Sequence, residues 1–88
     1  MIHYRVVFAR HAVKDARKIQ EAGLKENVEK LFRILEENPF QNTPPYQKLV
    51  GDLARCYSRR IGLQHRLVYA VYEEVKVVKV LRMRTHYE

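Results

Sequence analysis

The sequence predicts one α+β domain in which an N-terminal strand and a two-helix hairpin pack on one face of a twisted, mainly antiparallel four-stranded sheet. Its 88 residues suffice for a single modest core, so we expect one domain over residues 1–88. A hydrophobic content of 47%, with three glycines and three prolines, is typical of a chain that folds. The spacing of apolar residues also changes from strand-like to helical and back along the chain.

The first half of the chain predicts a strand followed by two helices. Ile2, Tyr4, Val6 and Phe8 alternate with other residues, which indicates a strand with one buried face. Helical spacing then begins at residue 9 and runs to Gly23, a residue type common at helix ends, and a second helical stripe ends at an Asn-Pro pair. The stripes comprise Ala9, Ala12, Val13, Ala16 and Ile19, and then Leu24, Val28, Leu31, Phe32 and Leu35.

The second half predicts an ordered loop and then three antiparallel strands. The segment NPFQNTPPYQK, residues 38–48, holds all three prolines and few periodic apolar positions, which is typical of a semi-rigid loop. Three later segments are rich in β-branched and aromatic residues and are separated by short breaks, so we expect hairpin-linked strands. They are RCYSRRI at 55–61, HRLVYAVY at 65–72 and VKVVKVLR at 75–82. The sheet face away from the helices would then be available for function.

The charge of the chain favours a polyanionic partner. Lys and Arg number 17 against 10 Asp and Glu, giving a formal net charge of +7. Such a surface attracts nucleic acid through the release of counterions, although a basic charge that serves solubility alone stays open. No apolar export signal opens the chain and no apolar run approaches the ~18 residues of a membrane span. Cys56 has no second cysteine to pair with, so we expect a cytoplasmic protein without membrane contact.

Arginine, histidine and tyrosine residues in the second half form the set that metal-free RNA cleavage needs. Arg66 lies on the middle one of the three predicted strands, while the neighbours Arg59 and Arg60 must face opposite sides of the sheet. His86 and Tyr87 end the chain and could transfer protons and stack on a base. Each residue has a plainer interpretation as a solvated arginine or an incidental terminal side chain. No motif for metal ligands is present, so we expect neither a metal nor a cofactor.

The order of four segments resembles the YoeB (Txe) branch of the RelE superfamily of type II toxins. These segments are PPYQKLVGDL, YSRRI, QHRLVYAV and a terminal THYE, and the match spans residues 44–88. The resemblance implies a RelE-like fold and a ribosome-dependent endoribonuclease that cuts mRNA in the A site and so inhibits translation. It also implies a cognate antitoxin of the YefM/Phd type, and homodimers are known in this branch. No apolar stripe looks surplus to core packing, so the sequence itself lends a homodimer little support.

The resemblance implies roles for individual residues. Arg66 matches the family's phosphate-stabilising arginine, His86 its candidate proton-transfer residue and Tyr87 its terminal aromatic residue. The implied reaction is attack of the ribose 2′-hydroxyl on the adjacent phosphate, which leaves a cyclic phosphate. We further expect three basic residues to contact RNA, namely Lys48, Arg59 and Arg60.

Gln47 departs from the family pattern. Relatives usually carry glutamate here as the proposed general base, and a neutral amide cannot accept that proton. Three accounts stay open: a natural variant in which His86 does the proton work, a weakened natural toxin, or a deliberate substitution. Two other functions also remain: a ribosome-binding blocker of translation that no longer cuts, and a plain basic RNA-binding domain.

Overall fold

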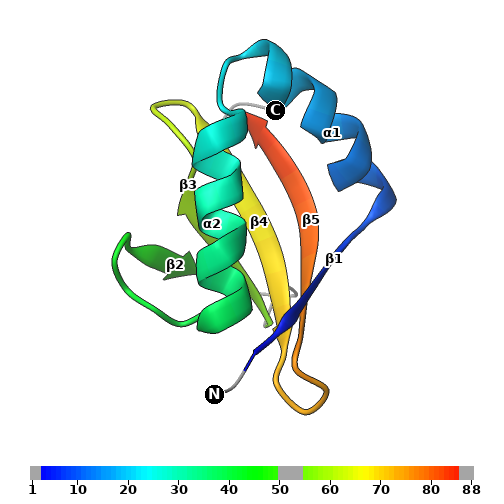
Figure 1. Cartoon of the computed structure of the whole chain (residues 1–88), viewed down its shortest axis with the longest axis vertical. Coiled ribbons are helices and arrows are strands. Elements are labelled where there is room, and N and C mark those ends of the chain that lie inside the picture. Colours follow the sequence, from blue (N-terminus) through cyan, green and yellow to red (C-terminus); the bar gives the residue numbers. More distant parts are fainter. Residues whose placement is uncertain (1–2, 50–54, 86–88) are drawn as a thin grey trace.

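The computed structural model describes residues 3–49 and 55–85, and within them the sheet has five strands. The strand order is β1-β5-β4-β3-β2, with β1 parallel to β5 and every other neighbouring pair antiparallel (Figure 1). In this part of the chain the helices have 12 and 13 residues, too few to cross a membrane. The elements are β1 (Arg5–Phe8), α1 (Arg10–Glu21), α2 (Lys25–Glu37), β2 (Tyr46–Lys48), β3 (Cys56–Arg60), β4 (His65–Tyr72) and β5 (Val77–Thr85).

The predicted α+β class, the helical hairpin and the three-strand meander are confirmed, but the count of four strands is wrong. The additional strand is β2, which forms inside the segment expected to be a loop and pairs with β3, Gln47 lying opposite Ser58. Three residues are too few to show a period of two, so the sequence pattern contains no signal for this strand. Its prolines, Pro44 and Pro45, stand before the strand, where a missing N–H disrupts no ladder.

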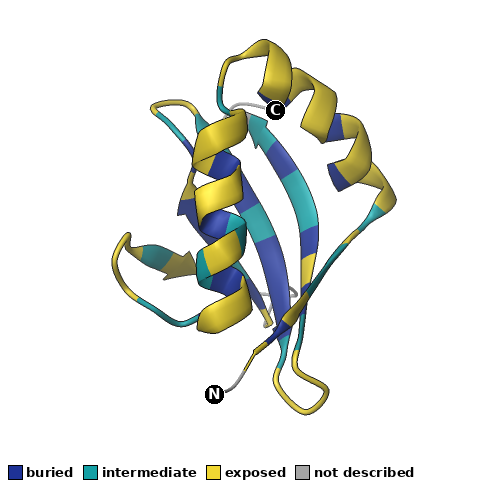
Figure 2. Cartoon of the chain, viewed as in Figure 1, coloured by how far each residue is buried: buried dark blue, intermediate teal, exposed yellow. Residues whose placement is uncertain are grey.

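Both helices pack against the same face of the sheet. In Figure 1, α2 lies across β3 and β4 while α1 runs beside the upper part of β5. Figure 2 shows the buried residues on the inward side of α2 and along the central strands. The three residues predicted to share one face of β4 all join the core, while Arg66 and Val68 on its other face are half-buried and only Ala70 there is buried. The core of the sheet comprises Leu67, Tyr69, Val71, Val78, Val80 and Met83, and α2 covers it with Val28, Leu31 and Leu35.

The apolar stripe of α1 is only partly used in the core, which corrects the expectation that no apolar stripe is surplus. Ala12 and Ile19 are buried, but Val13 is 62% exposed and Ala16 is also exposed. On β1, Phe8 is 44% exposed, and its ring lies 5.2 Å from that of Phe32 in an edge-to-face contact. An apolar surface therefore remains open between the two helices.

A buried carboxylate fastens α1 to β5. Asp15 Oδ2 accepts hydrogen bonds from Arg82 Nε at 2.8 Å and from the backbone N–H of Met83 at 2.9 Å. Burial alone would raise the pKa of Asp15, but these donors and the positive charges of Arg82 and Lys18 lower it below its ordinary value. Asp15 therefore stays ionised and links α1 to strand β5.

Arg59 is a core residue, which overturns its prediction as an RNA contact. Its side chain is 1% exposed, whereas the neighbouring Arg60 is exposed on the opposite face. The guanidinium donates hydrogen bonds to the Tyr69 hydroxyl and to three backbone carbonyls in the segment before β2, and it lies 5.1 Å from the Tyr46 ring centre. The carbonyls belong to Pro39, Gln41 and Pro44, at distances of 2.9, 2.7 and 2.6 Å. All its donor nitrogens are thus used inside the protein.

Replacing Asp15 by asparagine should lower the free energy of unfolding at neutral pH and make that free energy depend less on pH in the acid range. A carboxyl whose pKa is lowered on folding stabilises the protein above its unfolded value, near 3.8, and this contribution is lost as the pH falls below it. Asp15→Asn should cost about 1–3 kcal/mol at neutral pH and less at pH of about 2. Urea unfolding across this pH range measures both. The control is Glu21→Gln on the exposed surface of α1, and equal pH curves for the two variants would contradict the assignment.

Replacing Arg59 by methionine should destabilise the protein strongly, because one phenol and three carbonyls lose their donor. We expect a loss of about 3 kcal/mol or more in the free energy of unfolding. The matched control is Arg60→Met on the next residue, whose exposed side chain should change stability by less than ~0.5 kcal/mol. Chemical denaturation of both variants measures these free energies of unfolding. Similar small losses in the two variants would show that the three carbonyls find other donors.

Candidate active site

The site lies on the sheet face away from the helices, across β2, β3 and β4. Residues opposite each other in neighbouring strands share a face, so Gln47, Ser58 and Val68 form one row and Arg60 and Arg66 lie in the next. Here the surface is hollowed into a cavity of about 290 Å³. It is lined by Pro44, Pro45, Gln47, Ser58, Arg60 and Arg66.

Three arginines stand side by side across the sheet. Arg60 pairs with Arg66 between β3 and β4, and Arg66 pairs with Arg84 between β4 and β5. Arg60 is exposed and the other two are half-buried. Like charges directly opposite one another destabilise a sheet, so this row suits an anionic ligand better than it suits the empty fold. The sequence does not predict that Arg84 belongs to a cationic row, because its place opposite Arg66 depends on the register of two strands.

Arg66 and Gln47 are in direct contact. Arg66 Nη1 donates a hydrogen bond of 2.9 Å to Gln47 Oε1, although the two residues are 19 positions apart. They belong to β4 and β2, which lie on either side of β3, so the two strands are about 9.6 Å apart, or two strand spacings. Their side chains must therefore meet above β3, on the face that carries Ser58.

The other predicted site residues fare differently. Lys48 follows Gln47 on β2 and is exposed, but successive side chains alternate, so it projects from the opposite face of the strand. Arg60 lines the cavity, and Arg59 does not. His86 and Tyr87 lie outside the described residues. The strand that precedes them, β5, ends at Thr85, which pairs with His65, the neighbour of Arg66.

Burial shifts the pKa of two titratable groups of the sheet. Burial raises the pKa of the Cys56 thiol, which keeps it protonated and unreactive. Burial also raises the pKa of Tyr69, whose hydroxyl accepts a hydrogen bond from Arg59 in the core. In residues 3–49 and 55–85, no group of three or more His, Cys, Asp or Glu side chains could hold a metal ion.

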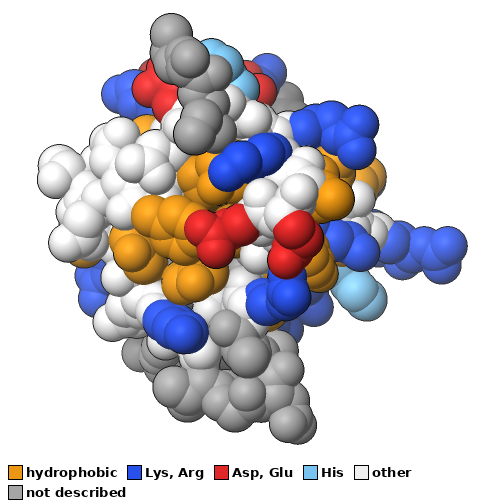
Figure 3. All heavy atoms as spheres, turned by 90° about the horizontal axis from the view of Figure 1, so that it is seen from below, with side chains coloured by type: hydrophobic (Ala, Val, Ile, Leu, Met, Phe, Trp, Pro, Cys, Tyr) orange, Lys and Arg blue, Asp and Glu red, His pale blue; other side chains and the backbone are white. Residues whose placement is uncertain are grey.

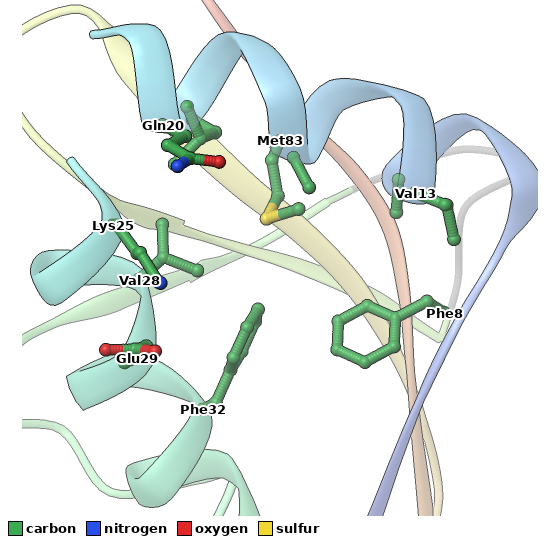
Figure 4. Close-up of a pocket in the computed structure, with 11 residues that line it drawn as sticks. Phe8, Val13, Gln20, Lys25, Val28, Glu29, Phe32 and Met83 are labelled. Atoms are coloured by element: carbon green, nitrogen blue, oxygen red, sulfur yellow. The ribbon is translucent and has the colours of Figure 1, made fainter. Parts of the chain in front are cut away.

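A second hollow, of about 310 Å³, lies between α1 and α2 and has a different character (Figure 4). The rings of Phe8 and Phe32 face it from opposite sides, with Val13 and Val28 beside them. Lys25 and Glu29 stand at its α2 side. This groove is suited to an apolar surface, and it lacks the grouped cations of the first cavity.

The end of the molecule that carries the β4–β5 turn presents both charge signs. Figure 3 shows Lys and Arg side chains around much of its outline and Asp and Glu side chains in small groups. One such pair is exposed, Arg55 Nη1 lying 2.9 Å from Glu74 Oε1. The hydrogen bond from Arg55 lowers the pKa of Glu74. Exposed ion pairs of this kind contribute little to the free energy of unfolding. This end of the molecule thus differs from the row of Arg60, Arg66 and Arg84 on the sheet.

A curated relative covers almost the whole chain. The toxin YoeB of Streptomyces coelicolor is 31% identical over 85 residues, which is 94% of this chain and 99% of the relative.

Solved structures of similar proteins share the fold. A YoeB dimer from Staphylococcus aureus aligns with a TM-score of 0.80 at 26% identity, covering 97% of this chain and 99% of that one. A heterotetrameric YoeB–YefM toxin–antitoxin complex from the same organism aligns with a TM-score of 0.78, also at 26% identity, covering 96% and 98%. These likenesses extend over both helices and the sheet.

A family model supports the same relationship independently of any single relative. It describes the YoeB-like toxin of bacterial type II toxin–antitoxin systems and matches residues 8–87. The match includes the arginine row, Gln47 and the hydrophobic face beneath them. The chain therefore belongs to the YoeB-like toxin family of bacterial type II toxin–antitoxin systems.

Proposed function

We propose that this toxin is a ribosome-dependent endoribonuclease that cuts mRNA in the A site without a metal ion and so inhibits translation. The observation that carries the proposal is the cavity in which Arg60 and Arg66 converge beside Gln47. Membership of the YoeB-like family supports it. The site would lie in the cytoplasm, where ribosomes and message are found.

The arginine row supplies electrostatic stabilisation for phosphate chemistry. In the proposed step the ribose 2′-oxygen attacks the adjacent phosphorus, the bond to the 5′-oxygen of the next nucleotide breaks, and a 2′,3′-cyclic phosphate forms. Negative charge grows on the non-bridging oxygens, and Arg66, with Arg60 and Arg84 on either side, would stabilise it. Guanidinium groups preorganised on a sheet need little rearrangement to do so.

Proton transfer must come from other residues. One proton leaves the 2′-hydroxyl and one reaches the departing 5′-oxygen, and we assign His86 to this work because imidazole titrates near neutral pH. Tyr87 would stack on a neighbouring base. Gln47 cannot remove a proton, but its contact with Arg66 supports a role in orienting the guanidinium.

A translation blocker that occupies the A site without cutting is the second candidate. The observation in its favour is Gln47 itself, a neutral amide at the position where relatives usually carry glutamate. In this candidate the arginine row still binds phosphate, but the general base that would remove the 2′-hydroxyl proton is missing. It predicts stalled ribosomes that carry intact message.

We propose two protein partners. A cognate YefM-type antitoxin would neutralise the toxin, as in the heterotetrameric complex of the similar protein, and acidic segments that fold on binding would suit this basic chain. A homodimer is proposed from the similar YoeB dimer. The exposed apolar groove between the helices is compatible with burial in either assembly.

Ribosomes programmed with a defined mRNA test the proposed activity. The protein as it stands should produce discrete 3′ ends at the A-site codon, mapped by primer extension. Gln47→Glu should raise the single-turnover rate by about 10²-fold to 10⁴-fold if the carboxylate restores a general base. An unchanged rate in this variant would eliminate the general-base account and leave proton transfer to His86.

Two further variants complete this test. Arg66→Ala should abolish the cleavage ends, and Arg33→Ala, which removes an exposed arginine of α2 on the other side of the sheet, is its matched control. Intact message from every variant, with ribosomes stalled, would replace the nuclease by the blocker.

A further inference from the structure

We infer that the Ser58 hydroxyl is a substrate contact, hidden beneath the Arg66–Gln47 hydrogen bond and donating to the RNA phosphate when that phosphate takes Arg66. The inference rests on the proposed function, since it assigns a further ligand of the same phosphate.

Ser58 is buried without satisfying its side chain. The residue is 2% exposed, and its Oγ finds no hydrogen-bond partner in the part of the chain that the structure describes. A buried hydroxyl without a partner costs free energy, and native proteins rarely keep one without a reason. Alanine or valine would fill a central strand at lower cost, so the hydroxyl calls for an explanation outside the fold.

The position of Ser58 indicates what that explanation is. It lines the 290 Å³ cavity together with Gln47, Arg60 and Arg66, and it stands opposite Gln47 in the β2–β3 register. On the same strand, Arg60 is two residues away and therefore projects from the same face. A group held by the two arginines would therefore lie next to the serine on the same face of the sheet.

The Arg66–Gln47 hydrogen bond explains why the hydroxyl is hidden. Because β3 lies between β2 and β4, this bond of 2.9 Å crosses above β3 and covers Ser58. A phosphate offers Arg66 a charged acceptor, which forms a stronger hydrogen bond than the neutral Gln47 amide. When Arg66 exchanges the Gln47 oxygen for a phosphate oxygen, the Ser58 hydroxyl would become accessible to that phosphate.

Binding would therefore satisfy two groups at once. Arg66 passes from an amide oxygen to a phosphate oxygen, and the Ser58 hydroxyl gains its missing acceptor on the same phosphate. No covalent bond is made or broken in this exchange, and Ser58 acts only as a hydrogen-bond donor. The alternative ligand is an ordered water, which would satisfy the hydroxyl in the free protein as well.

A substitution separates these cases because it should affect binding and stability in opposite ways. Ser58→Ala should weaken the affinity for a short single-stranded oligoribonucleotide about ten-fold or more, the effect of losing a hydrogen bond to a charged group. The same change should leave the thermal unfolding midpoint unchanged or raise it, since no bond is lost in the free protein. NMR titration of the full chain measures the affinity, and calorimetry measures the midpoint.

Thr43→Val is the matched control, because it replaces an exposed hydroxyl of the segment before β2 by a methyl group. Its RNA affinity should equal that of the parent protein. Equal affinity in Ser58→Ala, a clearly lower unfolding midpoint, or a parent protein that does not bind the oligoribonucleotide would each overturn the inference.

The ribosome assay keeps the two proposals distinguishable. Uncut message together with an affinity that depends on Ser58 would refute the nuclease and support the contact. Cut message with unchanged affinity and rate in Ser58→Ala would support the nuclease and refute the contact.

Discussion

The buried guanidinium of Arg59 is the interaction on which the functional face depends. A positive charge is costly inside a protein unless its hydrogen bonds are satisfied, and here the partners are a phenol and three backbone carbonyls. Those carbonyls belong to the proline-rich segment that leads from α2 into β2. Arg59 therefore holds an irregular stretch of chain against the core, where apolar packing alone would leave carbonyl groups without donors.

The geometry of the site follows from this anchor. β2 has three residues and is an edge strand, so its own ladder could not keep it in place. Arg59 pairs with Tyr46 across β2 and β3, and the next residue of β2 is Gln47. One face of β3 thus supports the edge strand from inside, while the other face carries Ser58 and Arg60 into the cavity. Neighbouring arginines with opposite tasks are a direct result of strand alternation.

Periodicity predicted most of the fold. Arg66 was singled out because a charged residue stands directly before the apolar run of the middle predicted strand, and Gln47 because it departs from a family pattern. Their contact could not be predicted, since it depends on β2, whose three residues show no period. Alternation showed that Arg59 and Arg60 face opposite sides but not which one faces the core. Arg84 and Ser58 gained meaning only from cross-strand register, which a single sequence does not contain.

The lengths of the two outer strands have a consequence for the protein in a crowded cell. β1 has four residues and β2 three, and β2 follows directly after two prolines. A long, flat outer strand offers unpaired N–H and C=O groups to other chains and is a common starting point for aggregation. Here the long strands β4 and β5 are enclosed between neighbours. A copy of the chain that has not yet met a partner protein is thereby protected from joining its sheet to that of another copy.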